Sequence, residues 1–278
     1  MTQSSKKENG GILKKIFSDL TFKRGIASIL IFLILWEIGF RFHEWFGIMV
    51  PFVGKIDAPT LVVARWREVV LQPGYWESWY LSFGRVFFGF LVAQVIGIPF
   101  GLAMAVNKNF RGLFFPPFEI LRPIPPLAWV PASIIFWPTT ELSIMFVTFL
   151  GAFYTVVINV LGGARSIDIQ YLRAAQSMGA TRWDLFRKII LPGTLPSIFI
   201  GAAVGMGITW EVVLAAEMIS GGGQQSGGGL GFFIWSSYMG GVMDQVIVGM
   251  ISIGLAGYIS SSLIRYLGHI SMPWRRMF

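Results

Sequence analysis

The sequence predicts an all-α polytopic membrane protein with about six transmembrane helices. Of its 278 residues, 54% are hydrophobic and 13% are charged, and the mean hydropathy is +0.66. This composition leaves too little polar surface to cover a globule in water. Apolar runs of spanning length recur along the chain, and lysines and arginines gather on one predicted side of them. Lipid is therefore the expected solvent for much of the protein surface.

The N-terminal 43 residues are predicted to contain a surface helix and the first span. Residues 1–24 are polar and basic, with apolar side chains at helical spacing, which predicts a cytoplasmic amphipathic helix lying on the membrane. A disordered basic tail is the alternative. Residues 25–43 follow as the first transmembrane helix, flanked by arginines that can reach the interface. Because no small-residue cleavage site is present, we expect a retained signal anchor.

The remaining apolar runs are predicted to form one membrane core, residues 78–264. Half of the chain's 14 prolines lie between Pro116 and Pro138, so the run at 113–137 cannot be one straight helix. Broken backbone at membrane depth is tolerated only where protein buries it or water lines it, which places this run inside a helical bundle. The other spans are expected at 78–106, 141–160, 194–218 and 244–264.

Small residues at four-residue spacing occur in two of these spans. Such spacing lets helix backbones approach closely. We therefore expect these residues to serve helix packing rather than substrate contact. They are Gly97 and Gly101 in one span, and Gly201 and Gly205 in another, with Ala203 and Gly207 interleaved.

Basic residues predict which side of the membrane each connection occupies. With the N-terminus in the cytoplasm, the opposite side holds only three lysines and arginines, Lys55, Arg65 and Arg67. This bias is typical of cytoplasmic loops and places both termini, with a tail at 265–278, in the cytoplasm. The net charge of +8 then requires no nucleic acid. The 16 cytoplasmic basic residues are Lys6, Lys7, Lys14, Lys15, Lys23, Arg24, Lys108, Arg111, Arg165, Arg173, Arg182, Arg187, Lys188, Arg265, Arg275 and Arg276.

The connection at residues 165–192 is predicted to fold into two short helices outside the membrane. Gly179 can take a left-handed conformation and end the first helix. Thr181 can cap the second, with Asp184 in capping-box position, and this helix is expected to run to a break at Pro192. A compact, basic pair of helices of this kind can transmit force to a partner protein.

The same connection contains Ala174 and Ala175, then Gly179 after three residues, then Ile189 after nine more, followed by Leu191 and Pro192. This spacing resembles the EAA signature of permease subunits of binding-protein-dependent ABC importers. The resemblance implies the type I ABC importer transmembrane fold for the core, with this loop as the coupling helix that sits in a groove of a cytoplasmic ATPase subunit. Arg173 stands where the signature has glutamate, so the glutamate's role is not transferred. The residues expected to couple to the ATPase are Ala174, Ala175, Gly179, Ala180, Ile189, Leu191 and Pro192.

The resemblance also implies partners and a class of substrate. The partners are two cytoplasmic ABC ATPase subunits that bind ATP and Mg²⁺, an extracytoplasmic substrate-binding protein, and a second permease subunit in the bacterial inner membrane. The second permease subunit is expected to form a homodimer, or a pseudo-dimer if it is a similar but different permease. Residues 82–90, 121–131 and 209–222 are similar to the subgroup that imports nitrate, nitrite, bicarbonate, taurine and alkanesulfonates. Overall likeness to cyanobacterial nitrate permeases makes nitrate or nitrite the expected substrate, with bicarbonate or taurine and other sulfonates as alternatives.

Ionisable residues at membrane depth are candidates for the substrate pathway of an anion. Arg85 is predicted at the outer edge of its span, where reaching lipid headgroups is an alternative role. Arg122 lies three residues from Glu119, so a local ion pair is the alternative there.

A second group of candidates follows in the span at 194–218 and beyond it. Glu211 and Glu217 would repel an anion, so they are expected to hold an arginine or to bond the glycine-rich backbone at 221–231. Glu217 shares a helix face with Trp210, and Glu211 points about 100° away. Trp235 lies near the glycine-rich stretch and is the remaining pathway candidate.

The chain is not expected to be an enzyme. It contains no GxxxxGK[ST] motif, so nucleotide must bind elsewhere. With no cysteine, and with His43 and His269 expected on opposite sides of the membrane, we expect neither catalytic nor metal-ligating residues and no cofactor in this chain. A membrane enzyme acting on lipid would need such a constellation. A secondary anion transporter is the other alternative, but neither an internal repeat nor an acid cluster is found.

Overall fold

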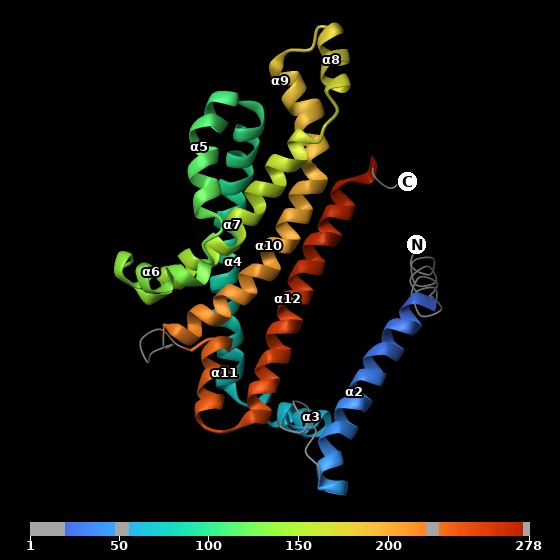
Figure 1. The fold of residues 1–278 in the computed structure, drawn as a ribbon, viewed down its shortest axis with the longest axis vertical. Coiled ribbons are helices and arrows are strands. Elements are labelled where there is room, and N and C mark those ends of the chain that lie inside the picture. Colours follow the sequence, from blue (N-terminus) through green and yellow to red (C-terminus); the bar gives the residue numbers. More distant parts are fainter. Residues whose placement is uncertain (1–19, 48–55, 221–227, 275–278) are drawn as a thin grey trace, which may run out of the picture. The chain divides into compact units, whose positions relative to one another are not determined.

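The computed structural model describes residues 20–47, 56–220 and 228–274, and every regular element in these ranges is a helix (Figure 1). The chain divides into two units, one of residues 1–69 with 242–245 and the other of residues 70–241 with 246–278. Five helices within the described ranges are long and apolar enough to cross a membrane. The predicted surface helix at 1–24 lies mostly outside the described residues.

The first unit contains α2 (Leu20–Phe46) and α3 (Pro59–Val69). The first predicted span therefore forms, and it is longer at both ends than expected. Glu37 joins the two helices, because it accepts hydrogen bonds from Arg41 at 2.6 Å and from the Thr60 hydroxyl at 2.9 Å. Arg65 on α3 pairs at 2.7 Å with Asp244, which belongs to the same unit. Burial, and then the charge of Asp244, raise the pKa of Asp57 just before α3.

The second unit is built on α4 (Pro73–Val106), α7 (Thr140–Arg165) and α10 (Leu191–Ile219), which cross one another in the centre of the unit (Figure 1). α7 is the most buried of the five spans. One apolar cluster joins the three helices through Leu102, Val156, Val160 and Ile198. The remaining long helix, α12 (Met243–Ser271), contributes Ser260, whose hydroxyl accepts a hydrogen bond from the Trp210 indole at 3.0 Å.

Glycines allow the three central helices to touch. A Cβ atom placed on Gly101 would lie 2.9 Å from Val160 of α7, and one on Gly97 would lie 3.3 Å from Val156. A Cβ atom on Gly201 of α10 would lie 2.7 Å from Asn159. These contacts confirm the predicted close approach. Gly207 differs from that prediction, since nothing lies within 4 Å of its Cβ position.

The proline-rich segment does not form a sixth continuous span. It contains the end of α5 (Lys108–Leu121), a short 3₁₀ turn at Pro126–Trp129 and the seven-residue helix α6 (Val130–Phe136). The residues between α5 and the turn include Pro123 and Pro125, which remove backbone donors and restrict the residues before them. The break in this segment was predicted, and the sixth crossing is replaced by these shorter helices.

The close packing of α4 on α7 generates a prediction at a matched pair of glycines. A Cβ atom on Gly89 would lie 2.9 Å from the backbone of Met145 and Phe149, whereas the Cβ position of Gly84, five residues earlier, is open. We expect Gly89→Ala to lower stability by about 1–3 kcal/mol, as overpacked sites do, and Gly84→Ala to have little effect. Thermal unfolding in detergent measures both. Equal shifts would contradict the packing described here.

Candidate functional site

The coupling segment, residues 165–192, begins with two capped helices. α8 (Ile169–Ser177) starts at Asp168, whose carboxylate accepts the Gln170 backbone N–H at 2.8 Å. Gly179 follows with φ of +83°, a conformation that disfavours other residues. Thr181 and Asp184 then form a reciprocal capping box at the start of α9 (Arg182–Leu185). The predicted end of the first helix and start of the second are both confirmed.

The predicted break at Pro192 is wrong. α9 continues through a π-helical turn, η3 (Phe186–Ile190), directly into α10. In this wider turn the Leu191 backbone N–H bonds to the carbonyl of Phe186, five residues back. The turn changes the hydrogen-bond register just before Pro192, a residue that has no N–H to donate. One helix therefore runs from Arg182 to Ile219, and the coupling segment is directly continuous with a membrane span.

Most residues of the predicted signature lie around two cavities that share Ala175 and Ile189. The larger cavity has a volume of 490 Å³ and is also lined by Ala174 and Pro192. The second has a volume of 370 Å³ and is also lined by Gly179 and Ala180. Leu191 is the exception, since it packs inward against the apolar cluster around Val156 and Ile198. The structure thus brings six of the seven predicted residues to one surface.

Large apolar side chains surround these cavities and are exposed. Met178 is 82% exposed, and Tyr171 and Trp183 are exposed nearby on α8 and α9. Figure 1 shows α8 and α9 projecting beyond the neighbouring helices of this unit. Exposed apolar groups with cavities between them are typical of a surface that binds another protein. The coupling segment can therefore bind a partner protein. The binding surface lies at the N-terminal end of α10, next to the π-helical turn.

A buried charge cluster is made of Ser82, Arg85, Glu141 and Glu217. It lies toward the ends of α4, α7 and α10 that are far from the coupling segment. Arg85 is 1% exposed and Glu217 is 0% exposed. The Arg85 guanidinium donates to Glu217 at 2.7 Å and, through Nε, to Glu141 at 2.8 Å, with a further bond from Nη2 to Glu141. The alternative in which Arg85 reaches lipid headgroups is therefore wrong, because its charged group is directed into the protein.

Glu217 connects this cluster to the start of α11 (Leu230–Met239). Its carboxylate accepts the Gly231 backbone N–H at 2.8 Å and the Ser82 hydroxyl at 2.8 Å, and Ser82 accepts the Leu230 N–H at 2.8 Å. Gly229 has φ of +112°, and a Cβ atom there would overlap the Glu217 carboxylate. Of the two roles expected for Glu211 and Glu217, Glu217 has both, since it holds an arginine and bonds the glycine-rich backbone at Gly231. Glu211 has neither within the described residues. Residues 221–227 lie outside the described ranges.

The remaining pathway candidates lie apart from the cluster. Glu211 is exposed on α10, whereas Trp210 and Glu217 are buried on another face, as predicted. Arg122 pairs with Glu119 at 2.6 Å, and both side chains are partly exposed. Trp235 is partly exposed on α11. Each of these residues is accessible on this chain, but the structure does not bring them together.

Sequence reasoning missed Glu141 and Ser82, which complete the cluster. Glu141 lies in the first turn of α7, where Thr139 caps the helix, and its side chain is 35% exposed. A carboxylate at the start of an apolar span is a signal that could have identified it. Ser82 gives no such signal, because a single serine in a membrane helix is common.

The family match covers most of the second unit. Residues 97–275 match the family described as "Binding-protein-dependent transport system inner membrane component". A protein provisionally named an ABC transporter permease of Methanocaldococcus jannaschii is 39% identical over 71% of this chain and 72% of that protein. The nitrate import permease of Leptolyngbya laminosa is 33% identical over 77% of this chain and 78% of that protein.

Relatives with other named substrates match at similar levels. The taurine transport system permease of Escherichia coli is 33% identical over 72% of this chain and 70% of that protein. A bicarbonate transport system permease of Synechococcus elongatus is 31% identical over 87% and 86%. Among solved structures, a chain of the inward-facing MetNI methionine ABC transporter aligns with a TM-score of 0.50 and 26% identity, over 78% of this chain and 98% of that one.

The buried charge cluster predicts a large difference between two arginines. Arg85→Met would leave Glu217 buried without its cation, so we expect a loss of about 3–5 kcal/mol in stability. Arg122→Met removes the same charge from a partly exposed pair, and its loss should stay below about 1 kcal/mol. Thermal unfolding of both variants in nanodiscs measures the difference. Similar small losses would show that the cluster does not hold the helices together.

Proposed function

We propose that the substrate of this chain, which belongs to the family of binding-protein-dependent transport system inner membrane components, is nitrate or nitrite. The chain is an ABC importer permease of the group that includes nitrate, bicarbonate and taurine permeases. It has the type I ABC importer transmembrane fold and lies in the inner membrane. It is not itself an enzyme, since ATP hydrolysis in this class belongs to a separate subunit.

The coupling segment carries the proposal for how transport is powered. Two cytoplasmic ATPase subunits, which bind ATP and Mg²⁺, each receive the coupling segment of one permease subunit. The support is the exposed surface around Ala175 and Ile189, with its cavities and its apolar rim. Closure of the ATPases then moves α9, and α10 moves with it because the helix is continuous to Ile219.

The orientation of the chain follows from the same proposal. The coupling segment and both termini face the cytoplasm, which agrees with the basic residues at this end of the helices. α11 and the buried charge cluster then lie toward the side from which a binding protein delivers substrate. The amphipathic segment at 1–24 and the tail at 265–278 are cytoplasmic in this arrangement.

The substrate pathway is proposed to form against a second copy of the permease. Glu211, Arg122 and Trp235 are accessible on this chain and are the candidates for lining it. Glu211 must be paired or protonated there, since a bare carboxylate would repel an anion. Arg85 and Glu217 are proposed as positioning residues, because they bond each other and the start of α11.

Two neighbouring positions test the coupling surface. Ala175 lines both cavities, whereas Gln176 is exposed and lines neither. We expect Ala175→Trp to weaken ATPase association about thirtyfold or more, as at an interface hot spot, and Gln176→Trp to leave it nearly unchanged. Gly179→Asp should behave like Ala175→Trp, because φ of +83° is strained for aspartate. Co-purification with the ATPase measures association, and normal association by Ala175→Trp would exclude this surface.

The substrate is tested by ATP hydrolysis in liposomes that contain this chain, its ATPase partners and its binding protein. The panel is nitrate, nitrite, bicarbonate, sulfate and taurine. We expect nitrate or nitrite to raise the hydrolysis rate and the others to leave it at the basal value. Stimulation by bicarbonate or taurine alone would reassign the substrate within the same group. Transport driven by an ion gradient without ATP would contradict the importer class.

A further inference from the structure

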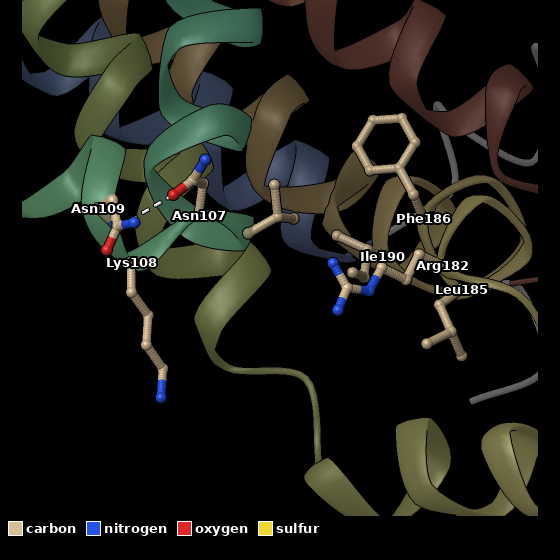
Figure 2. Close-up of a pocket in the computed structure, with 8 residues that line it drawn as sticks. Asn107, Lys108, Asn109, Arg182, Leu185, Phe186 and Ile190 are labelled. Atoms are coloured by element: carbon tan, nitrogen blue, oxygen red, sulfur yellow. Dashed lines mark hydrogen bonds between the residues drawn. The ribbon is translucent and has the colours of Figure 1, made fainter.

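A cavity of 560 Å³ lies between the α4–α5 turn and the start of the long helix that contains α9 and α10 (Figure 2). Val106, Asn107, Lys108 and Asn109 line one side of it. On the other side the lining residues are Arg182, Leu185, Phe186 and Ile190. None of them lines the two cavities of the coupling surface. This cavity is therefore a separate feature of the same end of the bundle.

The lining of this cavity carries positive charge and no carboxylate. Lys108 and Arg182 supply two cations, and neither forms an ion pair within the described residues. The nearby acid on α9, Asp184, is directed to Lys188 and Thr181 instead. Figure 2 shows the Arg182 guanidinium extending from its helix toward the α4–α5 turn. The cavity is therefore suited to an anion.

The local backbone holds the polar side of the cavity in place. The Asn107 side chain caps α5, accepting the backbone N–H groups of Asn109 at 3.0 Å and Phe110 at 3.1 Å. This cap fixes the turn from which the Lys108 side chain extends. On the opposite side, the capping box of Thr181 and Asp184 fixes the first turn of α9 and with it the position of Arg182.

The rest of the lining is apolar and lies between two helix ends. Val106 is the last residue of the span α4, and Arg182 is the first residue of the apolar helix that runs to Ile219. Between these two ends, Leu185, Phe186 and Ile190 form apolar walls. A ligand here meets one cation on each side of the cavity, with hydrocarbon side chains beside them. This combination is the chemistry of the boundary between headgroups and acyl chains.

We propose that this cavity binds an anionic phospholipid, with its phosphate between Lys108 and Arg182 and its glycerol and first acyl carbons against Val106, Leu185, Phe186 and Ile190. A free inorganic anion would use only the two cations and leave the apolar walls uncovered. A neutral lipid would use only the walls. The bound lipid would link the α4–α5 turn to the base of α9. The proposal depends on the membrane location of the chain and not on which anion is transported.

The test uses the full chain, delipidated in detergent, with dioleoylphosphatidylglycerol as the probe. Native mass spectrometry and the thermal unfolding midpoint both report binding. We expect phosphatidylglycerol to bind and to raise the midpoint, and dioleoylphosphatidylcholine and inorganic phosphate to do neither. Lys108→Gln with Arg182→Gln should weaken phosphatidylglycerol binding about twenty-five-fold, since each cation near an anionic lipid contributes about fivefold. Each single variant should lose about fivefold.

A second double variant controls for charge alone. Arg173→Gln with Arg187→Gln removes the same two charges from the coupling segment at positions that do not line the cavity. We expect this variant to bind phosphatidylglycerol as the wild type does. An equal loss in both double variants would overturn the site and leave only general attraction to anionic lipid. Stabilisation by inorganic phosphate or by phosphatidylcholine equal to that by phosphatidylglycerol would also overturn it.

Discussion

The ion pair of Arg85 with Glu217 is the interaction on which the arrangement of the second unit depends. A charged group at this depth is tolerated only with full compensation, because neither lipid nor apolar side chains can replace its hydration. Arg85 receives that compensation from α10 through Glu217, from α7 through Glu141, and from the carbonyl of Gly228 before α11. Four segments distant in sequence are therefore held at fixed positions by one guanidinium group.

The packing of the central helices links the buried ion pair to the opposite end of the second unit. Glycines of α4 and α10 bring both helices against α7, so the three cannot separate at one end without disturbing the other. The helix from Arg182 to Ile219 has 38 residues and is about 57 Å long at the usual rise of an α-helix. It carries Glu217 near one end and the coupling segment at the other. A movement of α9 is thus imposed on the helix that bears half of the buried ion pair.

Local features were predicted from the sequence, whereas the partners in long-range contacts were not. Gly179 and the capping box of Thr181 and Asp184 were identified because each depends on residues within a few positions of one another. The spans were identified because apolar length is a property of the composition. No pattern links Arg85 to Glu217, 132 residues away, so that pairing had to come from the fold. The error at Pro192 arose because a proline removes one backbone donor and need not end a helix: the turn before it is π-helical, and Pro99 and Pro196 also lie inside continuous helices.

The π-helical turn at Phe186–Ile190 also sets the angle between the faces of α9 and α10 around the helix axis. A π turn accommodates one more residue than an α turn, and one residue corresponds to about 100° around a helix axis. The faces of α9 and α10 are therefore offset by that angle relative to a regular helix. Loss of Phe186, Arg187 or Ile190 would rotate Ala174, Ala175, Gly179 and Ala180 around the axis relative to Pro192 without changing any of these side chains. The length of this turn, in addition to the identity of the exposed residues, thus determines the direction in which the coupling surface faces.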